Sequence, residues 1–406
     1  MNTGDTVFVL VSAALVMLMT PGLALFYGGM VRSKNVLGTV MQSFIILGVI
    51  TLEWVLWGYS LAFGPDHGGI IGSLGWFGLN NVGMDPSPDY ATTIPHLGFM
   101  IFQCMFAIIT PALITGAFAE RMKFGAFLLF TVLWATFVYN PLAHWVWGVG
   151  GWMGRMGALD FAGGTVVHIS SGFSALAAAI MIGRRLGFGE TAYIPHNLPM
   201  TITGAALLWF GWFGFNAGSA LAANGLAVNA FVVTHIASAV AALSWIFMES
   251  VHRGKATTLG AASGAVAGLV AITPASGFVG ALSSIIIGAL AGVICYGGVL
   301  LKSRLGYDDS LDVVGIHGLG GTWGALATGL FASRQINPAA ADGLFFGNPG
   351  QLWIQFVSVV VTIVFAFVMS LIILKIVDLV VGLRVDRDEE QRGLDISLHN
   401  ETGYSM

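Results

Sequence analysis

The sequence has very little charge. Only 9% of its 406 residues are Asp, Glu, Lys or Arg, whereas a soluble domain carries roughly 25%. This shortage excludes a soluble globular enzyme and a disordered protein, because neither is so poor in charge. The net charge of −4 also excludes the basic surface that a nucleic-acid-binding protein needs.

Cysteine is nearly absent as well. The two cysteines, Cys104 and Cys295, lie in apolar runs, so the chain has no disulfide framework and no cysteine-based metal knuckle. What the chain contains instead are long apolar runs separated by short charged segments. A helix needs about 20 mostly apolar residues to cross a membrane, and these runs are long enough.

The apolar runs therefore predict an all-α polytopic membrane protein with eleven transmembrane helices in a domain covering residues 1–380, followed by a polar tail at 381–406. The predicted spans are about 5–31, 36–63, 96–118, 124–147, 162–183, 197–220, 228–250, 257–275, 281–301, 311–332 and 350–379.

Basic residues predict the orientation of these spans. Fourteen of the 16 Lys and Arg residues lie in alternate loops, at the end of the last span or in the tail, and only Arg155 and Arg334 lie on the other side. Loops rich in Lys and Arg face the cytoplasm. We therefore expect a plasma (inner) membrane protein with its N-terminus outside and its tail in the cytoplasm.

The first ten spans divide into two sets of five, at about 5–185 and 195–332, and the last helix follows at 350–379. An odd number of spans per set gives the two sets opposite orientations, as in inverted repeats. Span five begins with DFAGGTVVHISSG from Asp160, and span ten with DVVGIHGLGG from Asp312. Each segment has an Asp and then a His, although the spacing is eight residues in one and five in the other. Both aspartates are expected to cap the helix that follows.

Ionisable side chains inside a membrane are costly and mark candidate functional sites. Those predicted to lie deep are Glu53, His168, His235 and His317. His168 and His317 occupy matching places in the two repeats, so a pseudo-twofold axis would bring their rings together to share a proton. No His-x-x-x-His or Glu-x-x-His spacing supplies further ligands for zinc, so we expect no metal. Glu53 has no assigned function and is expected to make a buried hydrogen bond or a subunit contact.

Aromatic residues line one face of several spans. Trp212, Phe215 and Ser219 share a face of span six, Phe102 and Phe106 are four residues apart in span three, and Trp147 ends span four. Such stripes usually pack in a core. Together, however, an indole ring and a hydroxyl acceptor would hold a small cation, and phenyl rings beneath would form a dry constriction that a bare cation cannot cross cheaply.

In these residues the chain resembles the ammonium transporter family, which also includes the Rhesus-type proteins. The similar stretches are PGLALFYGGMVRSKN from Pro21, GAFAERMKF from Gly116, DFAGGTVVHISSG, GWFGFNAGSALAAN from Gly211, GIHGLGGTWG from Gly315, and then VGLRV and EEQRGLD in the tail.

The resemblance implies a homotrimer in which each subunit has its own pore, and a tail that meets PII-type regulatory proteins. It implies an outer cation site of Phe106, Trp147 and Ser219, with Phe102 close by and Asp160 in support. It also implies a gate of Phe106 and Phe215, and a pore lined by His168, His317 and Trp212.

The function expected from this resemblance is ammonium transport without a cofactor and without enzymatic activity. Ammonium would be captured outside, lose a proton near the gate and cross as ammonia, with net proton transfer. Methylammonium is a further candidate substrate. A passive channel for neutral ammonia, an ammonium sensor and a membrane enzyme that uses the histidines remain open as alternatives.

Overall fold

Long apolar runs form helices because a helix satisfies its own backbone polar groups in a medium without water. The computed structural model describes residues 1–404. Within them, nine helices are long and apolar enough to cross a membrane. Two shorter helical segments, Thr258–Ile272 and Val314–Phe331, lie where the two remaining spans were predicted.

Up to residue 185 the longer helices are α1 (Thr3–Met30), α2 (Val36–Glu53), α4 (His96–Phe118), α5 (Phe124–Trp134) and α8 (Ser170–Ile182). They are followed by α9 (Leu198–Gly218), α10 (Gly225–Arg253), α11 (Thr258–Ile272), α12 (Ala281–Leu305), α13 (Gly320–Phe331) and α14 (Pro349–Val380). Shorter α-helices are α3 (Tyr59–Phe63), α6 (Asn140–Trp147), α7 (Trp152–Met156), α15 (Arg387–Arg392) and α16 (Leu394–His399).

Four segments are π-helical turns, in which the backbone is wound more widely than in an α-helix. They are η2 (Trp54–Gly58), η4 (Ala135–Tyr139), η5 (Gly164–Ile169) and η6 (Val314–Leu319). The 3₁₀ turns are η1 (Ser33–Asn35), η3 (Leu74–Leu79) and η7 (Leu344–Phe346). Two small antiparallel sheets pair β1 (Asp66–His67) with β2 (Ile71–Gly72), and β3 (Pro86–Ser87) with β4 (Ala91–Pro95).

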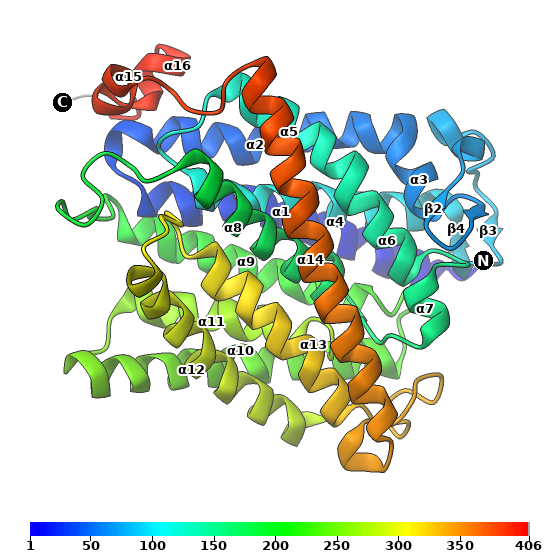
Figure 1. Cartoon of the computed structure of the whole chain (residues 1–406). Coiled ribbons are helices and arrows are strands. Elements are labelled where there is room, and N and C mark those ends of the chain that lie inside the picture. Colours follow the sequence, from blue (N-terminus) through cyan, green and yellow to red (C-terminus); the bar gives the residue numbers. More distant parts are fainter. Residues whose placement is uncertain (405–406) are drawn as a thin grey trace.

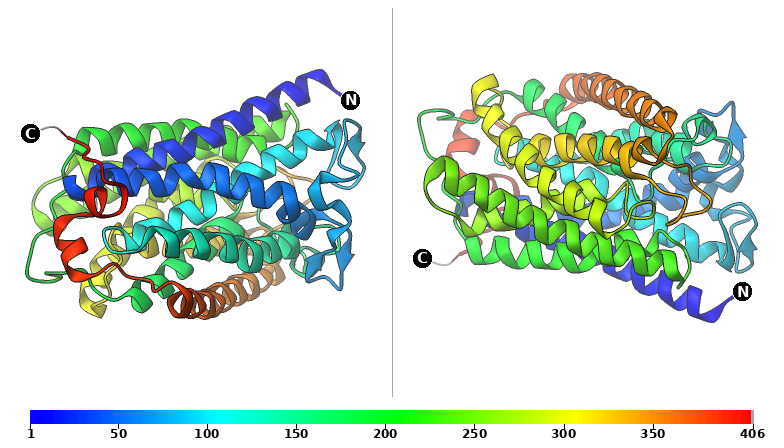
Figure 2. Two further views of the ribbon diagram at one scale, coloured as in Figure 1. Left: turned by 90° about the horizontal axis from the view of Figure 1, so that it is seen from above. Right: turned by 90° about the horizontal axis from the view of Figure 1, so that it is seen from below.

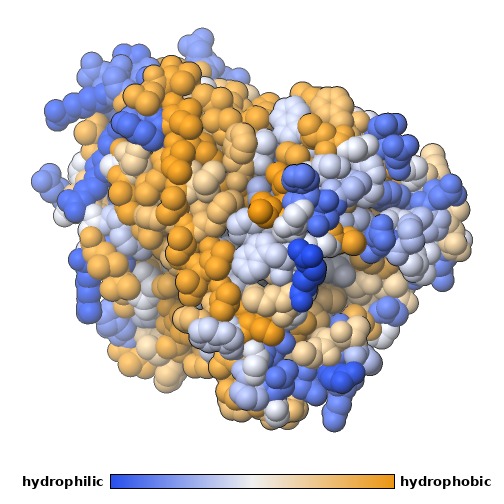
Figure 3. Space-filling view, turned by 45° about the vertical axis from the view of Figure 1, so that its right-hand side comes forward, coloured by the Kyte–Doolittle hydropathy of each residue, from blue (hydrophilic) through white to orange (hydrophobic). Residues whose placement is uncertain are grey.

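Many of the helices run roughly along one direction, and α14 crosses them obliquely (Figure 1). The N-terminus and the helices α15 and α16 of the tail lie at opposite ends of the bundle (Figures 1 and 2). The small sheets lie at the end that holds the N-terminus, and α15 and α16 lie at the other end (Figure 1). A broad band of hydrophobic residues covers the face left of centre in Figure 3, and hydrophilic residues gather at its left margin and over much of its right half. Such a surface suits a protein whose middle contacts lipid.

Small residues bring the first helix of each predicted repeat into close contact. A Cβ atom on Gly204 of α9 would lie 2.2 Å from the backbone nitrogen of Phe26 in α1, and one on Gly214 would lie 2.7 Å from the backbone oxygen of Ser12. The pairing of later α9 residues with earlier α1 residues shows that these helices are antiparallel. Only glycine permits backbones to approach this closely.

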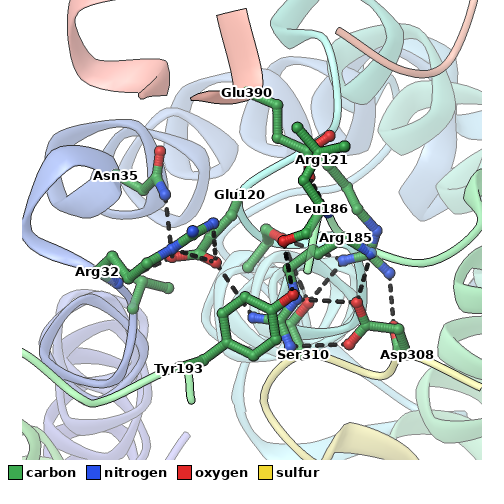
Figure 4. A network of polar contacts seen from close by, with 12 residues as sticks. Arg32, Asn35, Glu120, Arg121, Arg185, Leu186, Tyr193, Asp308, Ser310 and Glu390 are labelled. Atoms are coloured by element: carbon green, nitrogen blue, oxygen red, sulfur yellow. Dashed lines mark hydrogen bonds and ion pairs between the residues drawn. The ribbon is translucent and has the colours of Figure 1, made fainter. Parts of the chain in front are cut away.

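A polar network closes the end of the bundle that holds the tail (Figure 4). Glu120 pairs with Arg32 at 2.9 Å and with Arg185 at 3.2 Å, and Arg185 pairs with Asp308 at 2.8 Å. The tail joins through Glu390, which accepts a hydrogen bond from the Leu186 backbone at 2.7 Å. Loops from both predicted repeats and the tail are thus tied together at one point.

Candidate functional site

Two histidine rings meet in the interior of the bundle. His168 in η5 is 1% exposed and His317 in η6 is 4% exposed. Their Nδ1 atoms are 3.3 Å apart, and their ring centroids are 5.3 Å apart. A hydrogen bond between two imidazole nitrogens requires one donor and one acceptor, so this contact can hold one proton between the two Nδ1 atoms.

Glycines at the crossing of the two broken helices make this contact possible. A Cβ atom on Gly172 would lie 2.2 Å from the backbone nitrogen of Gly318, and one on Gly321 would lie 2.8 Å from the Cβ of His168. Any larger residue at either position would therefore push the two π-helical turns apart.

Each histidine follows an aspartate that caps its π-helical turn. Asp160 Oδ1 accepts hydrogen bonds from the backbone of Gly163 at 2.8 Å and Gly164 at 2.6 Å, while Oδ2 accepts one from Thr165 at 2.8 Å. This confirms the predicted cap. The carboxylate satisfies amides that have no partner at the start of a helix.

The prediction that Asp312 caps the second segment is wrong. Asp312 has a φ of 64° and pairs with Lys302 instead. Asp309 is the residue that caps η6, since its Oδ2 accepts a hydrogen bond from the Val314 backbone at 2.8 Å. Asp309 precedes His317 by eight residues, as Asp160 precedes His168, so the two segments match more closely than the sequence comparison indicated.

The histidines line a narrow apolar lumen. Its cavity volume is about 10 Å³, on the order of a single water molecule. The Trp212 ring lies 5.5 Å from that of His168, and its indole nitrogen donates to Thr273 Oγ1 at 2.8 Å. The lining residues are Met19, Leu23, Phe26, Ile109, Leu113, Val167, His168, Leu208, Trp212, Phe215, Val266 and His317.

Two phenyl rings separate this lumen from a wider cavity. Phe215 lines the lumen and Phe106 lines the wider cavity. Their ring centroids are only 4.2 Å apart, and each residue is 1% exposed. The pair is therefore closed in this structure.

The wider cavity, here called the vestibule, has a volume of about 330 Å³. Its lining includes the predicted residues Phe106, Trp147 and Ser219. The Ser219 hydroxyl donates to the Phe215 carbonyl at 2.9 Å, so its oxygen is left to accept a hydrogen bond from a guest. The Trp147 indole nitrogen donates to the Asp160 carbonyl at 2.9 Å, so its ring face rather than its N–H is available to the cavity.

Two residues expected at the outer site do not line the vestibule. Phe102 is fully buried beside Phe106, with ring centroids 5.0 Å apart, and a Cβ atom on Gly218 would lie 2.8 Å from its ring. Asp160 directs its carboxylate into the cap described above. Both residues support the wall of the site rather than face its interior.

The vestibule also has polar lining residues that the sequence did not predict. Asp89, Tyr90 and Gln103 line the cavity, and Asp89 is exposed. Gln103 precedes Phe106 by three residues and follows Phe99 by four, which is the spacing of one helix face. That spacing is visible in the sequence and places Gln103 on the face of α4 that bears Phe99 and Phe106.

His235 is not part of the pore. It lies on the surface of α10, exposed, with its ring 5.4 Å from that of Trp209. Among residues 1–404, no group of three or more His, Cys, Asp or Glu side chains is arranged to hold a metal ion.

Comparison with known proteins agrees with this geometry. The model of the Ammonium Transporter Family matches residues 7–404. An ammonium transporter of Bacillus subtilis (strain 168) is 57% identical over 405 residues, which cover 100% of this chain and 99% of that protein. Ammonium transporter Amt1 of Archaeoglobus fulgidus is 50% identical, with 100% of both chains covered.

Solved structures show the same fold. Mep2 of Saccharomyces cerevisiae has a TM-score of 0.90 and 36% identity, covering 96% of this chain and 89% of its own. A structure described as a sensor Amt protein has a TM-score of 0.90 and 30% identity, covering 98% of both chains. The similar proteins thus include transporters and a sensor. The full-length match of sequence and fold shows that this chain is a multi-pass membrane protein that belongs to the ammonium transporter family.

Proposed function

We propose that this protein transports ammonium by capturing the cation in the vestibule, removing a proton at the phenyl gate and conducting ammonia past His168 and His317. The relatives named above as ammonium transporters support the substrate. The observation that carries the mechanism is the order of three features along one path: a vestibule with free acceptors, a closed phenyl pair, and an apolar lumen with a shared-proton histidine pair.

Capture relies on groups that suit a small cation with N–H donors. The Ser219 oxygen accepts a hydrogen bond, and the Trp147 ring face attracts positive charge through its quadrupole. The Asp89 carboxylate adds a negative charge to the vestibule wall. Asp160 acts indirectly, because it holds the Trp147 indole through its carbonyl and caps η5 through its carboxylate.

Deprotonation follows from the cost of moving a cation past the gate. The Phe106 and Phe215 rings and the apolar lumen offer a cation almost no polar partners, and desolvating an unpaired charge costs several kcal/mol or more. Neutral ammonia avoids this cost. Trp212 and the histidine rings line the path, and an imidazole nitrogen can donate to or accept from ammonia.

The proton left behind follows through the histidine pair. The two Nδ1 atoms lie 3.3 Å apart, within hydrogen-bond distance, so the pair can hold a proton and pass it between its members as ammonia crosses. Transport then moves net positive charge. A passive channel for neutral ammonia is the alternative, and it differs by moving no charge.

We propose that the protein lies in the plasma (inner) membrane and crosses it with eleven transmembrane helices. The N-terminus is outside the cell and the C-terminus is in the cytoplasm. The N-terminus and the tail helices α15 and α16 lie at opposite ends of the bundle, which supports an odd number of crossings (Figure 2). Two inverted repeats at about 5–185 and 195–332 account for the antiparallel pairing of α1 and α9 and for the matching Asp–His segments.

For partners, we propose a homotrimer, with no cofactor and no enzymatic activity. The homotrimer rests on the resemblance of the chain to the ammonium transporter family. We also propose that the tail at 381–406 meets a PII-type regulatory protein, because it is docked on the inner network through Glu390. An ammonium-sensing function is the alternative suggested by the similarity to the sensor Amt protein.

The test is His168→Ala in reconstituted membranes, with ammonium-evoked current as the measurement. We expect the current or its selectivity for ammonium over potassium to fall, because the shared-proton pair is lost. Unchanged current and unchanged selectivity would show that the histidines relay no proton.

A further inference from the structure

Glu53 is an acid that lies inside the helix bundle and outside the pore. It is the last residue of α2 and is 2% exposed. It lines neither the vestibule nor the lumen. Within residues 1–404, none of the ion pairs includes Glu53. An ionised carboxylate in this place would have no compensating positive charge.

One oxygen of Glu53 is well satisfied. Asn140 Nδ2 donates to Glu53 Oε1 at 2.8 Å, and the Thr136 hydroxyl donates to the same oxygen at 3.3 Å. The Trp57 indole nitrogen donates to Thr136 at 3.0 Å and holds that hydroxyl in place. These contacts confirm the buried hydrogen bond expected for Glu53 from the sequence.

The other oxygen is not satisfied, and neither is its neighbour. Glu53 Oε2 and Asn140 Oδ1 are both buried acceptors without a hydrogen-bond partner among the described residues. Leaving one such group unpaired costs about 1–3 kcal/mol. The two atoms belong to side chains that are already joined by one hydrogen bond, so one additional proton between them would satisfy both.

A larger guest does not fit beside the Glu53 oxygen. A Cβ atom on Gly58 would lie 2.3 Å from Oε2, so the backbone of η2 fills the space next to it. Titratable groups near the carboxyl on other helices include Cys104 of α4 and Tyr139 of η4. A thiol and a phenol supply no positive charge.

We propose that Glu53 and Asn140 form a proton-binding site, in which Glu53 Oε2 carries a proton and donates it to Asn140 Oδ1. With the existing bond from Asn140 Nδ2 to Glu53 Oε1, this closes a cyclic acid–amide pair. The proton removes the buried charge and satisfies both unpartnered oxygens at once.

The Glu53–Asn140 pair connects two irregular segments of the helix bundle. Glu53 directly precedes η2, and Asn140 directly follows η4. The site therefore joins the ends of two π-helical turns. The proton bound here belongs to the scaffold, and it is separate from the proton shared by the pore histidines.

Infrared spectroscopy of the purified full-length protein tests the proposal, with Glu53→Gln as the matched variant. At neutral pH, we expect the difference between the wild type and E53Q to contain the carbonyl stretch of one protonated carboxyl, which shifts in heavy water. We expect Asn140→Leu to shift that band, because the acid loses its amide acceptor. A difference spectrum that contains carboxylate bands instead would overturn the proposal.

Two further measurements separate the site from the pore. E53Q retains a side chain of the same shape with its own donor for Asn140 Oδ1, so we expect it to keep the ammonium-evoked current and to melt no lower than the wild type at neutral pH. Because the wild type must release its proton on unfolding at neutral pH, its melting temperature should fall relative to that of E53Q as the pH rises. A current lost in E53Q, or parallel pH profiles, would contradict a scaffold proton site.

Discussion

Replacing Gly172 by Ala tests how closely the two broken helices must cross. The added Cβ would lie 2.2 Å from the backbone nitrogen of Gly318 and 2.3 Å from its Cα, where ordinary contacts begin at 3.4 Å. Both atoms are backbone atoms, so no side chain can rotate away, and the helices must separate by about 1.2 Å, the difference between 3.4 and 2.2 Å. The His168–His317 contact is 3.3 Å long, close to the limit at which a hydrogen bond is lost.

We therefore expect Gly172→Ala to lower stability by about 1–3 kcal/mol through overpacking and to reduce the ammonium-evoked current by breaking the histidine contact. Thermal unfolding in detergent and current in proteoliposomes are the two measurements. Gly48→Ala is the matched control, since a Cβ at Gly48 of α2 meets nothing within 4 Å. A Gly172→Ala protein with wild-type current and wild-type melting temperature would refute the proposed crossing.

Three other variants address the cap, the gate and the inner network. Asp160→Ala should lower stability by about 2 kcal/mol or more, measured by thermal unfolding, because the amides at the start of η5 lose a charged acceptor; an unchanged melting temperature would contradict the cap. Phe215→Ala should join the vestibule to the lumen and admit potassium, seen as a potassium-evoked current that the wild type lacks; continued exclusion of potassium would show that the phenyl pair is not the barrier. Burial alone would raise the pKa of Glu120, but the hydrogen bonds and charges of Arg32 and Arg185 lower that pKa below its ordinary value. Its stabilising effect is therefore present above the unfolded pKa of about 4.3 and is lost as the pH falls, so Glu120→Gln should lose less melting temperature on acidification than the wild type.

Much of the fold follows from the sequence because membrane helices obey simple constraints. Apolar length alone placed the long helices within a few residues of their observed ends, whereas short helices such as α7, α15 and α16 were not predicted. The encounter of His168 with His317 was also predictable, since both residues follow an Asp at the start of a glycine-rich apolar segment in opposite halves of the chain. Such a pattern depends on repeat symmetry and not on details of packing.

Details that depend on backbone conformation were not predictable. The segment before His317 offers three aspartates, and which of them caps η6 is decided by the φ of 64° at Asp312, which turns that residue away toward Lys302. The π-helical turns have no evident sequence signature, although they place both histidines.

The composition of the vestibule was also only partly predictable. Phe102 and Phe106 share one face of α4. The Phe102 ring packs against Gly218 of α9 and is buried there, whereas Phe106 lines the cavity. Asp89 reaches the vestibule from the segment between β3 and β4. Contacts of this kind depend on how distant segments pack, and helix periodicity does not contain that information.

Ammonium-evoked charge movement in proteoliposomes, recorded at an acidic and at an alkaline external pH together with the internal pH, tests the central mechanism most directly. If ammonium is captured as a cation, split at the gate and passed as ammonia with its proton, charge should move into the liposomes at both pH values, and potassium should evoke none. Internal alkalinisation without any charge movement would contradict this mechanism and identify a passive channel for neutral ammonia.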